Sequence, residues 1–409
     1  MSLMKLNCVA VCCCFALVAC SGDESPASTQ SGGEDMTIVQ VDMSGDMREQ
    51  VVDADMSSSD MNSMVVVDME EDDMQDSVED MSSLPDDMMS GDMGEMDLGG
   101  GDEDMASSDM GMVTDALYVG NSDVFASGPL TVVQGETTAS DLPLSVWHPS
   151  EAGEYAVVVF QHGFLMNTSY YDLMLRHIAS HGFIVAAPQM YAPGDNPLSA
   201  PGTEEEASNA KIVWETLDVT LPTVLTAGVV PRVDRLGAIG HSRGGKVIWM
   251  NLIDDPNLLS AAVGLEPVDT TGVGLATEPR AIPANGFAFS LPSLFIGAGL
   301  GSQPINAFAP ACAPEMDSYP AFFAGAMSPA YELVALEYGH MDMLDDDPAG
   351  CGFACSACVD GEGPRDLMRK ASAGWSVALF RGALQGSQNA VSALTDPTLA
   401  PVSASGRVK

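Results

Sequence analysis

Apolar residues in the second part of the chain fall into short continuous runs, separated by glycine, proline and polar residues. The run at 155–160 contains no charged position, which is typical of a strand buried on both faces of a sheet. The expected strands are 155–160, 183–187, 236–240, 261–265, 294–297 and 331–336. Helical spacing of apolar residues marks 168–181, 204–221, 246–252 and 365–384. This alternation predicts an α/β fold with a mostly parallel central sheet, helices on both faces, and a ligand site at the carboxyl ends of the strands.

The first twenty residues follow another pattern. Lys5 precedes an apolar stretch over 6–19, which is too short to span a bilayer but is typical of a secretion signal. The stretch ends in Leu-Val-Ala followed by Cys20, which resembles the lipobox of bacterial lipoproteins. We therefore expect a lipoprotein signal peptide over 1–20, lipidation of Cys20, and display at the outer membrane or cell surface. An ordinary signal peptide that happens to contain cysteines is the alternative.

Residues 21–115 consist mainly of Asp, Met, Ser and Gly in irregular repetition, with 28 acidic side chains against one basic side chain, Arg48. No helical or strand period is sustained, and repulsion between carboxylates opposes collapse. We predict a disordered acidic tether, followed by one folded domain over 116–409. Metal binding by Met and Asp is the alternative, although no ligand spacing recurs. The formal net charge of the whole chain, -43, excludes nucleic-acid binding through a cationic face.

The most informative motif is Gly-His-Ser-Arg-Gly at 240–244, between an expected strand and an expected helix. Small flanking residues at such a turn let the serine project above the sheet, with a helix amino terminus beneath it. This placement predicts that Ser242 is a nucleophile. A glycine-rich turn capped by a serine is the alternative interpretation.

A serine nucleophile needs a base, and the base needs an acid that holds it in one tautomer. Of the six histidines, His340 alone follows Ser242 by enough chain to arrive after a further strand, and we expect it to be the base. The acid should follow the strand at 261–265. Glu266 stands there, and Asp269 is the reserve.

A tetrahedral intermediate also needs two preorganised donors. We assign the backbone N–H groups of Arg243, directly after the nucleophile, and of Phe164, after the strand at 155–160; Leu165 is the alternative to Phe164. Phe164, Met190 and Tyr191 are expected to form the apolar wall of a substrate pocket.

Two clusters near the end of the chain have metal-binding alternatives. Cys312, Cys351, Cys355 and Cys358 predict two disulfides in an exported protein, in one of three connectivities, whereas a zinc site or an iron-sulfur loop would use the same thiols. Four aspartates over 342–347 follow His340 closely. They predict a solvated acidic turn that caps the next element rather than a Ca²⁺ site. Asp342 is expected to raise the pKa of His340 by proximity. No metal or cofactor is expected.

The stretches at 160–164, 177–189, 240–246 and 338–347 resemble the chlorophyllase family, which has the α/β-hydrolase fold. The likeness runs from about 124 to 384. It implies hydrolysis of a carboxylic ester with Ser242 as nucleophile and His340 as base; in plants and algae the family's ester is the phytyl ester of chlorophyll. One departure concerns the acid, because Gly-Leu-Glu-Pro-Val at 264–268 replaces the family's Gly-Ile-Asp-Pro-Val.

The preferred interpretation is thus a surface-anchored serine esterase acting on small lipophilic esters. A related secreted branch includes polyester hydrolases and platelet-activating-factor acetylhydrolases, so an extracellular lipid or polyester is an alternative substrate. A non-catalytic binding lipoprotein on the same fold, and an acyl transferase that uses the same acyl-enzyme, are the remaining alternatives.

The tether can be tested on intact cells with a protease that cleaves at aspartate. If residues 21–115 are extended and solvated, cleavage is expected to release the folded domain with its esterase activity into the medium. Activity that stays with the cells after complete digestion would contradict the tether.

Overall fold

The computed structural model describes residues 123–190, 200–270, 279–307, 309–346, 351 and 355–409. The expected signal peptide, the lipidation site at Cys20 and the acidic tether lie outside these residues, as does Tyr191. Within them, no helix is long and apolar enough to cross a membrane.

The described residues form one sheet in the order β1-β2-β4-β3-β5-β6-β7-β8-β9. From β4 to β8 all neighbours are parallel, whereas β2 pairs antiparallel with β1 and β4, and β9 pairs antiparallel with β8. The strands are β1 Val132–Ala139, β2 Leu142–Pro149, β3 Gly153–Gln161, β4 Phe183–Pro188, β5 Val229–His241, β6 Ala261–Leu265, β7 Ser293–Ala298, β8 Ala330–Ala335 and β9 Ala404–Val408. The mostly parallel α/β architecture predicted from the sequence is confirmed.

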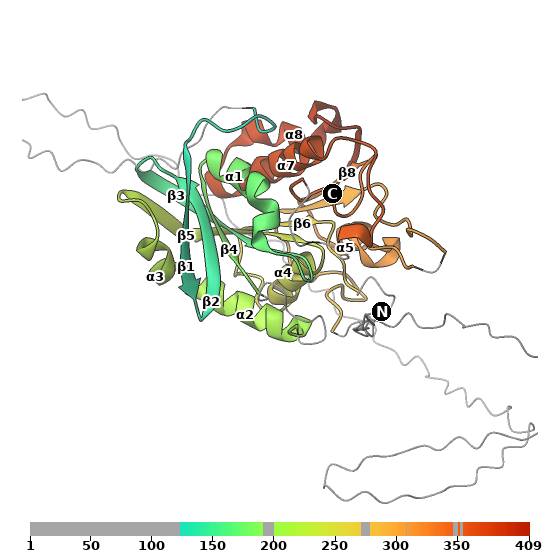
Figure 1. Cartoon of the computed structure of the whole chain (residues 1–409), viewed down its shortest axis with the longest axis horizontal. Helices are drawn as coiled ribbons and strands as arrows, with labels where there is room; N and C mark the ends of the chain where they lie inside the picture. The colour runs from blue at the N-terminus through green and yellow to red at the C-terminus, as the bar shows by residue number, and fades with distance from the viewer. Residues whose placement is uncertain (1–122, 191–199, 271–278, 308, 347–350, 352–354) are drawn as a thin grey trace, which may run out of the picture. The chain divides into compact units, whose positions relative to one another are not determined.

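Helices cover both faces of the sheet (Figure 1). The α-helices are α1 Asp172–Ser180, α2 Thr203–Glu215, α3 Leu217–Thr220, α4 Arg243–Asp254, α5 Tyr319–Gly325, α7 Arg365–Gln385 and α8 Ser392–Thr395. The short 3-10 helices are η1 Thr168–Tyr171, η2 Leu221–Thr223, η3 Glu315–Asp317, η4 Gln388–Ala390 and η5 Pro397–Leu399. The pair α1 and α7 packs on one face, and the pair α2 and α4 packs on the other.

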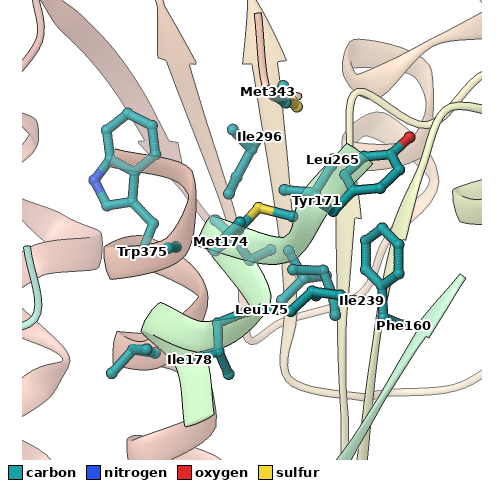
Figure 2. Close-up of a cluster of buried hydrophobic side chains, with 14 of the residues drawn as sticks. Phe160, Tyr171, Met174, Leu175, Ile178, Ile239, Leu265, Ile296, Met343 and Trp375 are labelled. Atoms are coloured by element: carbon teal, nitrogen blue, oxygen red, sulfur yellow. The ribbon is translucent and has the colours of Figure 1, made fainter. Parts of the chain in front are cut away.

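Two hydrophobic cores follow from the period-two alternation of β3. Val158 and Phe160 face the core beneath α1 and α7, whereas Val157 and Val159 face the core beneath α2 and α4. Both faces of the strand are therefore buried, which is why its sequence is a continuous apolar run. Figure 2 shows the first core, where side chains of α1 and Trp375 of α7 meet residues from the central strands.

The sequence prediction differs from the structure at the edges of the sheet. The strands β1, β2 and β9 were not predicted; β1 and β9 are edge strands with exposed positions, so neither has a long apolar run. The helix expected over 204–221 is broken at Thr216, whose hydroxyl donates to the carbonyls of Ile212 and Val213. This side-chain bond competes with the continuation of the helix, and Pro222 then sits in η2.

The orientation of α1 gives a stability prediction. Leu175 is fully buried in the first core, so Leu175→Ala is expected to lower the free energy of unfolding by about 2–5 kcal/mol. Leu173 lies on the same helix but is 51% exposed, and Leu173→Ala should change the value by less than about 0.5 kcal/mol. Urea unfolding of the two variants measures both, and equal losses would contradict this orientation.

Candidate active site

Ser242 occupies the turn between β5 and α4, at the carboxyl edge of the parallel strands. Its backbone has φ 55° and ψ -121°, a conformation that a non-glycine residue adopts only under strain. Backbone hydrogen bonds hold it there: its N–H donates to Leu265 O at 3.0 Å, and its carbonyl accepts from the N–H of Val268 at 3.1 Å. Ser242 thereby projects from a sharp strand-to-helix turn. The loop that follows β6 is hydrogen-bonded directly to this turn.

The glycines of the serine motif are required by close approach of the backbone. A Cβ on Gly244 would lie 2.2 Å from the carbonyl oxygen of Gln161, because α4 begins directly against the end of β3. A Cβ on Gly240 would lie 2.6 Å from the backbone of Gly244. Any larger side chain at these two positions would therefore displace the turn that carries Ser242.

His340 and Glu266 form a buried pair in the loops after β8 and β6. The Nδ1 of His340 is 2.8 Å from Oε2 of Glu266, and the other carboxylate oxygen accepts the N–H of Ala298 at 3.1 Å. His340 is 4% exposed and Glu266 is fully buried. Gly301 makes room for the carboxylate, since a Cβ there would lie 2.0 Å from Oε1 of Glu266. The first-choice acid of the sequence prediction is thus the one beside His340.

Asp269, the reserve acid, has other partners. Its carboxylate pairs with Lys246 at 3.3 Å and Arg280 at 2.9 Å, and it accepts backbone N–H groups from Ala281 and Ile282. These contacts place Asp269 in a separate buried ion cluster next to α4.

Burial controls the charge of the His340–Glu266 pair. Exclusion of water disfavours both charged forms, so it lowers the pKa of His340 and raises the pKa of Glu266. The expectation that Asp342 raises the pKa of His340 is wrong. Asp342 instead accepts the N–H groups of Gly339 and Gly361, pairs with Arg365, and adds to the raised pKa of Glu266.

The turn after β3 lies against the serine turn. The N–H of Met166 donates to Gly163 O at 3.0 Å, and Leu165 has a positive φ of 57°, so residues 163–166 form a tight turn. A Cβ on Gly163 would lie 3.4 Å from the Cβ of Ser242. The structure therefore brings the segment of Phe164 next to Ser242, because β3 and β5 are neighbours in the sheet. We call residues 163–166 the β3 turn.

Arg243 connects this turn with α2. Its backbone N–H belongs to the first turn of α4, where N–H groups lack acceptors within the helix. Its guanidinium carbon lies 4.8 Å from the centroid of the Phe164 ring, and Nε is 2.8 Å from the buried carboxylate of Glu206. Gln161 donates to the same carboxylate at 3.3 Å. The ring of Phe164 therefore packs against the Arg243–Glu206 ion pair, a contact that was not predicted from the sequence.

Of the expected pocket wall, Met190 is 7% exposed and belongs to the core beneath α2 and α4. Its N–H donates to Nε2 of His162 at 2.9 Å, and Nδ1 of His162 is 2.8 Å from the carbonyl of Gly163. His162 thus ties Met190 to the β3 turn. Burial lowers the pKa of His162 to about 4, so the neutral ring can accept and donate at once.

The four cysteines form two disulfides, Cys312–Cys358 and Cys351–Cys355. This outcome agrees with the disulfide prediction and excludes the zinc and iron-sulfur alternatives for these thiols. In the described part of the chain, no group of three or more His, Cys, Asp or Glu residues is arranged to hold a metal ion. The aspartates after His340 do not all form a solvated turn that caps the next element. Asp342 is 1% exposed, Asp345 accepts the N–H of Leu173 in the first turn of α1, far earlier in the chain, and Asp347 lies outside the described residues.

A parallel sheet with helices on both faces and a strained serine turn at its carboxyl edge is the architecture of the α/β hydrolases. The family model for chlorophyllases matches residues 120–406, and the chain belongs to the chlorophyllase family. It is 36% identical to chlorophyllase-2 of Arabidopsis thaliana over 252 residues, which cover 59% of this chain and 78% of the relative. It is 33% identical to chlorophyllase-1 of Arabidopsis thaliana over 288 residues, 67% of this chain and 86% of the relative. Chlorophyllase-1, chloroplastic, of Citrus unshiu is 34% identical over 265 residues, 64% of this chain and 78% of the relative.

Proposed function

We propose that the protein is a serine carboxylesterase that hydrolyses lipophilic esters through an acyl-enzyme. The observation that carries the proposal is the 2.8 Å hydrogen bond between His340 and Glu266, in the same site as the strained turn of Ser242. A buried imidazole oriented by a carboxylate next to a projecting serine is the arrangement that activates a hydroxyl for attack on a carbonyl.

In the proposed mechanism, Nε2 of His340 takes the proton of Ser242 Oγ as the oxygen attacks the ester carbonyl. Glu266 accepts the Nδ1–H of His340 and stabilises the imidazolium that forms. The imidazolium then gives its proton to the leaving alcohol, and an acyl-serine remains. Water attacks this ester with His340 again as base, which releases the acid and restores Ser242.

The negative oxygen of each tetrahedral intermediate is assigned to the backbone N–H groups of Arg243 and Phe164. Support comes from the position of Arg243 at the start of α4 and from the β3 turn, which lies against Ser242. The positive φ of Leu165 reverses the chain directly after Phe164 and so orients this segment at the edge of the sheet.

A lipophilic ester is the proposed substrate class. The relatives are named chlorophyllases, and the partly buried Phe164 provides apolar surface in the turn beside Ser242, whereas Met190 lies in the core. The lipobox at Cys20 and the acidic tether support a location on the cell envelope, where an extracellular lipid or polyester would be available as well as a chlorophyll-like ester. Display through a lipid anchor at the outer membrane or cell surface is part of the same proposal.

The nucleophile is tested with Ser242→Ala. The unmodified protein is expected to hydrolyse p-nitrophenyl esters of increasing acyl length and to be labelled covalently by an organophosphonate, and the variant should lose both. Chlorophyll a is assayed in parallel. Turnover of simple esters alone would indicate that the natural substrate is another lipid or a polyester. Unchanged hydrolysis by Ser242→Ala would refute the mechanism, and an inactive but folded unmodified protein would favour a binding role.

The acid is tested with Glu266→Gln, which keeps the length of the side chain but removes its charge. We expect kcat to fall on the order of 10³-fold or more, because the imidazolium loses its stabilising carboxylate and its tautomer is no longer fixed. Gly301→Ala should also lower kcat, because its methyl group would displace the Glu266 carboxylate.

The matched control for that glycine is Gly202→Ala, where no atom lies within 4 Å of the new methyl group, and its kcat should stay close to that of the unmodified protein. Active-site titration corrects each rate for the fraction of folded enzyme. Near-normal kcat in Glu266→Gln would assign the acid to another residue.

A further inference from the structure

Three buried hydrogen bonds connect the β3 turn with the backbone of His340. The N–H of Gly163 donates to the hydroxyl oxygen of Tyr171 at 3.4 Å. The Tyr171 hydroxyl is 2.8 Å from Nδ1 of His241, and Nε2 of His241 is 3.1 Å from the carbonyl oxygen of His340. We call this series the Tyr171–His241 bridge. No functional role was predicted for Tyr171 or His241 from the sequence.

The chemistry of the two ends fixes the direction of every bond in the bridge. A backbone N–H can only donate and a carbonyl oxygen can only accept, so the hydrogen of His241 must lie on Nε2. Its Nδ1 then carries a lone pair and accepts the hydrogen of the Tyr171 hydroxyl. Burial lowers the pKa of His241 and raises the pKa of Tyr171, so both side chains stay neutral and keep these roles.

Packing holds the two rings of the bridge in place. Tyr171 is fully buried and His241 is 1% exposed. The Tyr171 ring centroid lies 4.6 Å from that of Phe160, and the His241 centroid lies 4.6 Å from that of His340. In Figure 2, Tyr171 enters from the start of α1 with its hydroxyl oxygen directed away from the aliphatic side chains of the core.

The two segments that the bridge connects follow strands that are not neighbours in the sheet. The β3 turn follows β3 and His340 follows β8, and three strands, β5, β6 and β7, lie between them in the sheet. Small differences in the twist of each strand would add up over that separation. The bridge connects the two segments directly through two side chains. Tyr171 contacts the β3 turn, and His241 directly precedes Ser242.

We propose that Tyr171 and His241 are positioning residues that fix the spacing between the β3 turn and the base His340. The inference rests on the proposed function, because the spacing matters only if Phe164 stabilises an oxyanion and His340 moves a proton. Glu266 holds the ring of His340 at Nδ1, and His241 holds its backbone carbonyl, so the base is fixed at two points. His241 is also the residue before Ser242. Its imidazole therefore contacts or adjoins the β3 turn, the serine turn and the loop of His340.

The bridge is tested in the full chain with Tyr171→Phe, which removes one hydroxyl and keeps the ring. We expect kcat to fall about 10- to 100-fold with KM changed less than about twofold, since a small displacement of catalytic groups affects the transition state more than substrate binding. Tyr170→Phe is the control, because it removes a neighbouring phenol that takes no part in the bridge. Rates are given per active site titrated with an organophosphonate.

A second pair of variants separates hydrogen bonding from packing. His241→Leu removes the donor and the acceptor and should lower kcat at least as much as Tyr171→Phe. His241→Gln retains one donor and one acceptor, and is expected to recover most of that loss. Equal losses in the two variants would overturn the proposal in favour of a purely steric role, as would a kcat of Tyr171→Phe equal to that of Tyr170→Phe.

The tautomer of His241 provides a test that needs no variant to fold. Nitrogen NMR of the unmodified protein labelled with ¹⁵N-histidine is expected to show His241 neutral and protonated at Nε2 at pH 7. Protonation at Nδ1 would reverse the bond to Tyr171 and overturn the bridge. These tests are independent of Ser242→Ala. If they fail while hydrolysis still depends on Ser242, only the positioning role of Tyr171 and His241 is refuted. If hydrolysis does not depend on Ser242, the proposed function itself is refuted.

Discussion

The exclusion of water from Glu266 and His340 is the constraint on which the rest of the site depends. A carboxylate out of water needs hydrogen-bond donors that replace its hydration, and here they are the imidazole of His340 and the N–H of Ala298. His340 lies in the loop after β8 and Ala298 is the last residue of β7, so the loops after β6 and β8 must meet the end of β7. Gly301 allows that meeting because no side chain occupies the position of the carboxylate.

Backbone strain is concentrated at the same edge of the sheet. Among the described residues, five non-glycine residues have positive φ. Ser242 and Glu266 lie directly after β5 and β6, and Leu165 lies in the turn that follows β3. The other two form the hairpin between β1 and β2. Each such conformation costs about 1–3 kcal/mol, so surrounding hydrogen bonds must hold it. The strained conformations at this edge occur where the backbone turns sharply after a strand, so that a side chain projects from the sheet.

Most of the fold could be predicted from the sequence, for a physical reason, and so could the contact between His340 and Glu266. Parallel strands buried on both faces leave continuous apolar runs, and a serine between a strand and a helix indicates its own location. The edge strands β1 and β9 lacked that signal because part of each faces solvent. His162, His241 and Tyr171 could not be assigned either, because a histidine or tyrosine in a core gives the same sequence pattern whether it only packs or connects two loops.

Glu266 and Asp269 show why the choice between two nearby acids needs the structure. Glu266 is preferred from the sequence because it directly follows β6, but both carboxylates are fully buried after the same apolar strand, and sequence position does not show which of them contacts His340. Their partners do, because Asp269 faces two cations while Glu266 faces an imidazole.

Lys246 and Asp269 form a buried ion pair at α4. Lys246 is 1% exposed on α4, and its ammonium also donates to the Asp269 carbonyl at 2.8 Å. Removal of one member of such a pair leaves an uncompensated charge and costs about 3–5 kcal/mol. Asp269 therefore anchors the helix whose first residue follows Ser242, while Glu266 contacts the imidazole of His340. Gly301 leaves room for the longer side chain of Glu266, whose carboxylate contacts His340 directly.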